Sequence, residues 1–441
     1  REDLNREWRG LMRDLQITSK GIAARGCLVA AGLAGGTRIS LLENSQMKKT
    51  LAAVAVLGAF AGSAIAADVT LYGVVDQGLK YTRYDADTTA ATTNKVELKS
   101  GSQAGSRFGL KGMEELGDGY KVGFILESGF NADDGSMAKS GTIFNREASL
   151  SLYTPFGQLS AGKIGAITQG TSSWGKMGYF SAFGTSYGDF VAQDGQVTST
   201  TGVWDNMIAY QTPSFAGVKV YAQYSMGTSA SAVKNADDRT KYDSYTQVEN
   251  ESSTDRFYAI GATYDNGPAH LLFAVDSTNY ASWEAENSPK SKDTDDSLTV
   301  TLGGSWDFDV ARVYFGGQYF DEVKTSSVGV LKAFKATDVK VNGYGLTASV
   351  SAPVLGGTSY FGAGYVDASE ADSVVATQSA DYKAWMVSAG YKYDLSKRTN
   401  VYGVVSYSKA KVEFTNTADT TKSTDTKPSA VVAMFGLRHN F

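Results

Sequence analysis

The chain has 441 residues, including 48 glycines, 6 prolines and one cysteine, and its formal net charge is −5 at pH 7. The negative charge argues against a nucleic-acid partner, which needs a basic surface. The single cysteine excludes disulfide bonds within the chain, and the shortage of proline suits long strands, whose ladder hydrogen bonds proline would remove.

Residues 47–66 have the three regions of a secretory signal peptide. Lys48 and Lys49 form a basic start, and residues 51–60 form a short apolar segment. Residues 64–66 read Ala-Ile-Ala, which matches the small-residue site at which such peptides are cleaved. We therefore expect this segment to direct export and to be removed.

A signal peptide belongs at the N-terminus, yet 46 residues precede Met47. We interpret residues 1–46 as an extension caused by a start codon assigned too early. The alternative is a genuine extension with an amphipathic helix near residues 4–15. The only cysteine, Cys27, lies in this part, so we expect residues 67–441 to fold as one cysteine-free domain.

The rest of the chain predicts sixteen strands, each with the two-residue alternation of a strand between two environments. In chain order the predicted strands are 69–83, 106–115, 120–130, 143–154, 158–166, 205–213, 218–227, 256–264, 269–278, 297–306, 310–320, 341–352, 358–366, 382–393, 399–410 and 430–441.

The connections between these strands alternate between short and long. The short ones have two to five turn residues, as in LGDG at 116–119, whereas the long ones are polar, as in residues 227–255. A soluble sandwich gives no reason for this asymmetry, but a membrane β-barrel does, because tight turns lie on one rim and long loops on the other. Strands of about ten residues suit a tilted crossing of a bilayer. The pattern therefore predicts an all-β fold, a 16-stranded antiparallel transmembrane β-barrel.

The closing segment, 430–441, shows the alternation clearly. One face carries Val431, Ala433, Phe435, Leu437, His439 and Phe441. Taken alone, this segment fits the last strand of a soluble sandwich equally well. In a membrane barrel the same face meets lipid, and we expect Phe441 and His439 to lie in the aromatic girdle at the interface.

Six segments spread along the chain resemble the general Gram-negative porin family. They read VTLYGVVDQGL (69–79), GSRFGLKGMEELGDGYKVGFILESGF (105–130), IFNREASLSLYTPFGQLSAGK (143–163), DNMIAYQTPSFAGV (205–218), YKYDLSKRTNVYG (391–403) and GLRHNF (436–441). The resemblance implies an outer-membrane homotrimer whose channels pass small hydrophilic solutes and ions by passive diffusion. It further implies contact with outer-membrane lipid and lipopolysaccharide, and recognition of the terminal aromatic, Phe441, by the barrel-assembly machinery.

The resemblance also implies that a third long loop folds into the lumen and narrows the pore. Residues 165–204 occupy that position and are rich in glycine, serine and aromatic residues. A solvated external loop is the alternative. In such a pore, basic groups on the wall face acids on the loop, and the field between them orders passing ions.

The family's motifs map candidate constriction residues onto this chain. On the wall, SRFGLKG supplies Arg107 and Lys111, the segment after PFG supplies Lys163, and alternation turns Asp76 inward; Arg146 is a further candidate, although its parity points it outward. On the loop and the next strand, the candidate acids are Asp189, Asp194 and Asp205. The family often has an arginine just before the DN pair, where this chain has Trp204, which weakens the expectation of strong anion selectivity.

Two other functions compete with passive diffusion. An outer-membrane enzyme would need a histidine or paired carboxylates, but beyond residue 66 the only histidines are His270 and His439, without a nearby serine motif. We therefore expect no catalytic site, cofactor or metal. A substrate-preferring channel, for sugars or anions, or an adhesin is the other alternative. Aromatic residues of the third loop, such as Trp174 and Tyr187, could hold sugars, although loop packing explains them equally well.

Overall fold

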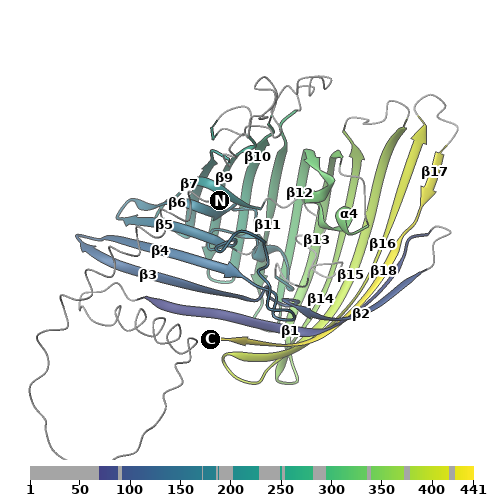
Figure 1. Ribbon diagram of the computed structural model, residues 1–441, viewed down its shortest axis with the longest axis horizontal. Helices are drawn as coiled ribbons and strands as arrows, with labels where there is room; N and C mark the ends of the chain where they lie inside the picture. Colours follow the sequence, from purple (N-terminus) through teal and green to yellow (C-terminus); the bar gives the residue numbers. More distant parts are fainter. Residues whose placement is uncertain are drawn as a thin grey trace, which may run out of the picture. The chain divides into compact units, whose positions relative to one another are not determined.

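The computed structural model describes residues 69–87, 92–170, 172–184, 187, 202–227, 249–250, 254–281, 295–334, 339–371, 378–416 and 423–441. Within them, one antiparallel sheet closes on itself as a β-barrel (Figure 1). Closure comes from β1 (Thr70–Asp85) and β18 (Ser429–Asn440), which pair from Val74 opposite Asn440 to Asp85 opposite Ser429. The predicted fold class is confirmed.

Each strand pairs with its neighbour in the sequence. The other strands are β2 (Thr93–Ser100), β3 (Arg107–Gly117), β4 (Tyr120–Gly129), β5 (Glu147–Thr154), β6 (Gly157–Gly165), β7 (Val203–Gln211), β8 (Val218–Ser225), β9 (Arg256–Asn266), β10 (Ala269–Asn279), β11 (Leu298–Asp307), β12 (Arg312–Lys324), β13 (Lys340–Val354), β14 (Gly357–Glu370), β15 (Gln378–Asp394), β16 (Thr399–Asn416) and β17 (Ser423–Thr426).

These eighteen segments form sixteen wall strands, because two wall strands are interrupted. Both β2 and β3 pair with β1, and residues 101–106 between them leave the ladder. Both β17 and β18 pair with β16, and they are separated at Pro428, which has no N–H to donate. The prediction missed β2 and began the strand at 143–154 too early, since β5 begins at Glu147.

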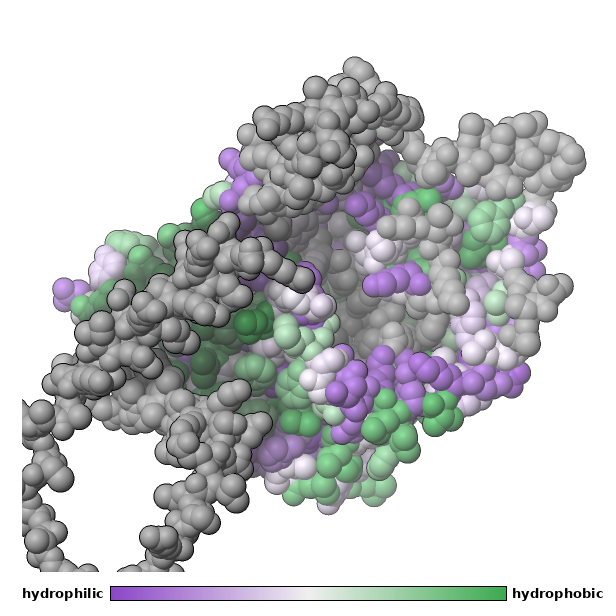
Figure 2. Space-filling model, viewed as in Figure 1, coloured by the Kyte–Doolittle hydropathy of each residue, from purple (hydrophilic) through white to green (hydrophobic). Residues whose placement is uncertain are grey.

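The alternation of the closing strand is confirmed in β18. Phe435 and Leu437 are 63% and 48% exposed, whereas Val432 and Met434 on the other face are buried. Similar rows of exposed Leu, Val and Phe side chains occur on the other strands, and Figure 2 shows apolar residues gathered in patches on the visible surface. Such an apolar outer band is what hydrocarbon neighbours require.

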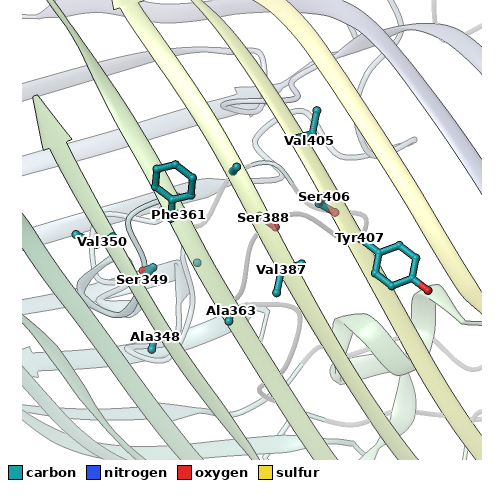
Figure 3. Close-up of a pocket in the computed structure, with 12 residues that line it drawn as sticks. Ala348, Ser349, Val350, Phe361, Ala363, Val387, Ser388, Val405, Ser406 and Tyr407 are labelled. Atoms are coloured by element: carbon teal, nitrogen blue, oxygen red, sulfur yellow. The ribbon is translucent and has the colours of Figure 1, made fainter. Parts of the chain in front are cut away.

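A shallow recess of about 800 Å³ lies on this outer face, over β13 to β16 (Figure 3). The side chains of Phe361, Val387 and Val405 surround it, and no charged residue lines it. The recess is therefore part of the apolar band and not a site for polar solutes.

The turns and helices are short. Between β3 and β4, Asp118 and Gly119 both have positive φ, 51° and 82°, which suits the two-residue turns of β-hairpins. The helical segments are η1 (Met177–Phe180), η2 (Thr325–Ser327) and α4 (Gly329–Ala333). No helix in the described ranges has the length and hydropathy needed to cross a membrane.

Candidate functional site

The long connection between β6 and β7 begins on the inner wall of the barrel. The backbone N–H of Ile167 donates to Gln223 Oε1 on β8 at 2.7 Å, and the Thr168 hydroxyl donates to Asp276 on β10 at 2.9 Å. Ser173 donates from its N–H and its hydroxyl to Glu147 on β5, at 3.1 and 2.8 Å. The buried acid Glu147, which sequence reasoning missed, therefore anchors this loop.

The middle of the loop is fixed by an aromatic side chain seated on glycines. Phe180 is fully buried, and its ring lies against Gly303 on β11 and Gly316 on β12. A Cβ atom at Gly303 would stand only 2.5 Å from this ring, so the close approach requires glycine. One step on, the N–H of Ala182 donates to Ser349 Oγ on β13 at 2.8 Å.

The last described part of the loop reaches β14 and β16. The Phe183 ring lies 5.6 Å from that of Tyr360, and the Tyr187 ring meets Tyr402 edge-on at 5.6 Å. The Tyr187 N–H donates to the Ser102 carbonyl at 2.7 Å. The described residues of the loop thus run across the inner face of the barrel, and burial raises the pKa of the Tyr187 hydroxyl, which stays neutral.

The loop aromatics are packing residues and not an open platform for sugars. Trp174, Phe180, Phe183 and Tyr187 are each at most 3% exposed. Lys176 stands over the Tyr221 ring with its Nζ 5.7 Å from the centroid, and burial lowers the pKa of this ammonium. Of the two alternatives that the sequence left open, sugar binding and loop packing, packing fits these contacts.

Two arginines meet one carboxylate where β3, β4 and β5 adjoin. Glu127 on β4 accepts from Arg146 Nε at 2.6 Å, and its other oxygen lies 3.4 Å from Arg107 Nε. The hydroxyl of Tyr72 donates to the same oxygen of Glu127 at 3.0 Å. Arg146 joins this group because it precedes β5, so strand parity does not govern its direction. Glu127 had no signal in the sequence reasoning, although it lies within the quoted segment 105–130.

Asp76 faces inward, as alternation predicted, but it has no exposed surface. Its carboxylate accepts from the Ala104 N–H at 2.6 Å and from the Tyr402 hydroxyl at 2.7 Å. The segment 101–106 covers it, and Ser106 Oγ bonds to both the N–H and the carbonyl of Asp76. Asp76 therefore holds this segment against β1 and does not face a passing ion.

Lys163 is ion-paired with Asp205 across β6 and β7. Along β6 the inward row contains the buried residues Ser160 and Ile164, and Lys163 falls on the alternate row with the 46%-exposed Leu159. The pairing therefore does not place Lys163 beside Arg107.

The second lysine candidate adjoins the arginines through Tyr72, whose hydroxyl donates to Glu127. Lys111 on β3 stands over the Tyr72 ring, 5.3 Å from its centroid. Trp204 stacks on Phe257, with centroids 5.0 Å apart and planes 17° apart, so its indole fills space where the family often has a cation. Asp189 and Asp194 lie outside the described residues.

A second connection, residues 325–334, also packs inward. It contains η2 and α4, and its apolar side chains Val328, Val330, Leu331 and Phe334 are buried against residues of β12 to β16. Figure 1 shows α4 in front of β13 to β15. Sequence reasoning missed this segment, although the apolar run VGVLKAF at 328–334 was a usable signal.

The two histidines are structural in this arrangement. His270 Nδ1 lies 2.8 Å from Asp265 and its ring packs on Tyr179, while His439 Nδ1 lies 2.8 Å from the Thr399 hydroxyl. Phe441 is tied to β1 by two backbone hydrogen bonds with Gly73, at 3.0 and 3.1 Å. No group of three metal-ligating side chains occurs in the part of the chain that the structure describes.

Comparison with known proteins places the chain among outer-membrane channels. A model of the Gram-negative porin family matches residues 52–412. The chain is 34% identical to an outer membrane porin protein of Bordetella pertussis over 82% of its length and 94% of the relative, and 30% identical to outer membrane porin protein 32 of Delftia acidovorans, over 83% and 90%. The solved anion-selective porin from Comamonas acidovorans is 26% identical with a TM-score of 0.55, covering 85% of this chain and 100% of the other.

Proposed function

We propose that Arg107, Glu127 and Arg146 select among the ions that pass through the lumen. The chain belongs to the Gram-negative porin family. The protein is an outer-membrane porin, a water-filled channel for passive diffusion of small hydrophilic solutes and ions. We call Arg107 and Arg146, which share the carboxylate of Glu127, the arginine pair.

The arginine pair favours anions because its positive charge is the more exposed. The side chains of Arg107 and Arg146 are 23% and 16% exposed, whereas that of Glu127 is 11% exposed. The other acids nearby, Asp76 and Glu147, are buried beneath hydrogen-bonded groups, so the exposed part of the group has more positive than negative charge. An excess of positive charge beside a narrow, water-filled passage with low-dielectric walls attracts anions. The anion selectivity named for the Comamonas acidovorans porin supports the same preference.

The described part of the third loop supports a constriction at this level. It is held to β5, β8, β10 and β13 by hydrogen bonds, which supports a position against the inner wall. We propose that this loop sets the pore width and that Asp189 and Asp194 form its acidic side, while the third candidate acid, Asp205, is offset by Lys163.

We further propose a homotrimer in contact with lipid and lipopolysaccharide, assembled by the barrel-assembly machinery, without residues 1–66. The family resemblance and the apolar outer band support this. Catalysis is the rival proposal, and the pairing of His270 with Asp265 and Tyr179 leaves that histidine in a packed contact. Purified protein in planar bilayers should open stepwise conductances, and a protein that opens none would contradict the channel.

A further inference from the structure

A polar cavity of about 470 Å³ lies at the short-turn end of β15, β16 and β18. Its lining includes four cationic side chains and one carboxylate: Lys392, Lys397, Arg398, Arg438 and Asp394. In a barrel of this kind the short turns face the periplasm. We call this space the mouth cavity.

The mouth cavity keeps an excess of positive charge. Lys392 Nζ lies 3.2 Å from Asp394, so these two charges offset each other. Arg438 Nε donates to the neutral Asn440 side chain at 3.2 Å. No carboxylate in the described ranges lies within ion-pair distance of Lys397 or Arg398, which sit in the turn 395–398. Lys397 and Arg398 therefore remain without an acidic partner at ion-pair distance within the described residues, whereas Arg438 is aligned with Asp76 on the neighbouring strand.

The strand register connects this cavity to the arginine pair. Arg107 lies opposite Val74, Val74 lies opposite Asn440, and the Asn440 N–H donates to the Arg398 carbonyl at 2.8 Å. With strands about 4.8 Å apart, Arg398 and Arg107 are separated by roughly 15 Å along one row. Arg438 lies one residue pair away from this row. Positive side chains thus lead from the short-turn rim to the arginine pair.

One polar group in the cavity lacks a partner. Asn400 is 8% exposed, lines the cavity, and its Oδ1 makes no hydrogen bond within the described residues. A buried carbonyl oxygen without a donor is costly, so this atom favours a ligand that brings a hydroxyl. Arginine and lysine favour anionic oxygens.

We propose that the mouth cavity is a second anion site, which binds inorganic hydrogen phosphate. The anionic oxygens accept from Arg398, Lys397 and Arg438, and the P–OH donates to Asn400 Oδ1. Sulfate at neutral pH has no hydroxyl, so it satisfies the cations but leaves Asn400 without a donor. The site lies on the inner wall and rests on the proposed channel function, since its ligand arrives through the lumen.

The test is a bilayer recording of the protein in KCl at fixed ionic strength, with inorganic phosphate added to the side of the short turns. Phosphate should lower the chloride conductance at concentrations about fivefold below those of sulfate, which is the worth of one hydrogen bond. In K397S/R398S the half-blocking phosphate concentration should rise by about tenfold. The variant Asn400→Ala should still respond to phosphate but should lose its preference over sulfate.

Controls separate this site from the channel itself. Lys409→Ser removes a cation on β16 away from the cavity and should leave the phosphate response unchanged. Equal effects of phosphate and sulfate on the parent protein, or an unchanged response in K397S/R398S, would overturn the phosphate site. A parent protein without conductance would instead overturn the proposed function.

Discussion

The arginine pair offers the sharpest prediction, because one double substitution reverses its charge. In R107S/R146S the group loses two cations and retains Glu127, so its net charge changes from +1 to −1. An ion about 5 Å from one net charge in water interacts by about 0.8 kcal/mol, and screening reduces this to about 0.5 kcal/mol. The counter-ion gains and the co-ion loses this amount, which gives a permeability ratio of about five.

We therefore expect an anion preference of about fivefold to become a cation preference of similar size. Across a tenfold KCl gradient the reversal potential should move by about 60 mV towards the potassium equilibrium potential. The triple variant R107S/R146S/E127Q is the matched control, and it should be nearly unselective. A reversal potential in R107S/R146S within about 10 mV of the parent value would refute the reasoning. Charges about 5 Å from an ion are only partly screened, so they must act on the ions in the passage.

Three further predictions follow from the same contacts. Lys163→Ser should shift the reversal potential by less than half of the change in Arg107→Ser, since Lys163 is neutralised by Asp205 and lies on the alternate row; equal shifts would contradict this. Phe180→Ala should loosen the third loop and lower the free energy of unfolding by about 3–5 kcal/mol. The distribution of single-channel conductances should become wider, and an unchanged distribution would contradict the anchoring. Deletion of Phe441 should reduce the amount of assembled barrel in outer membranes, measured by heat-modifiable gel mobility, because two hydrogen bonds with Gly73 are lost; normal yield would contradict it.

The strand pattern could be predicted because lipid and lumen impose opposite demands on alternate residues. Sequence periodicity located all sixteen wall strands, since each carries this contrast along most of its length. Their ends were harder to place. The residues of β2, TNKVELKS, carry only two large apolar side chains, Val96 and Leu98, on one face, so the contrast that marks a strand between two environments is short here.

The constriction residues were only partly predictable, because their neighbours decide their direction. Arg107 follows strict alternation, and its predicted inward direction agrees with its contact to Glu127. Arg146 stands just outside β5, where parity no longer applies, and a bonded carboxylate on the neighbouring strand β4 turns it towards Arg107. Asp76 has the right parity, but a segment about 30 residues later in the chain covers it. Non-local contacts of this kind have no signature in a single sequence.

The two inward connections explain why part of the inner wall can be apolar. Inward side chains of β13 to β16 include the apolar residues Val341, Val366, Ala384 and Met386, all at most 1% exposed. Such a surface would be unfavourable beside water, at about 25 cal/mol per Å², and the described parts of the third loop and of residues 325–334 bury it. Charged side chains remain on β1, β3 to β5 and β18 and at the short-turn ends of β15 and β16, and polar side chains such as Gln223 and Gln318 lie on other strands as well. A few arginines beside a narrow passage can therefore govern selectivity although the whole chain is negatively charged.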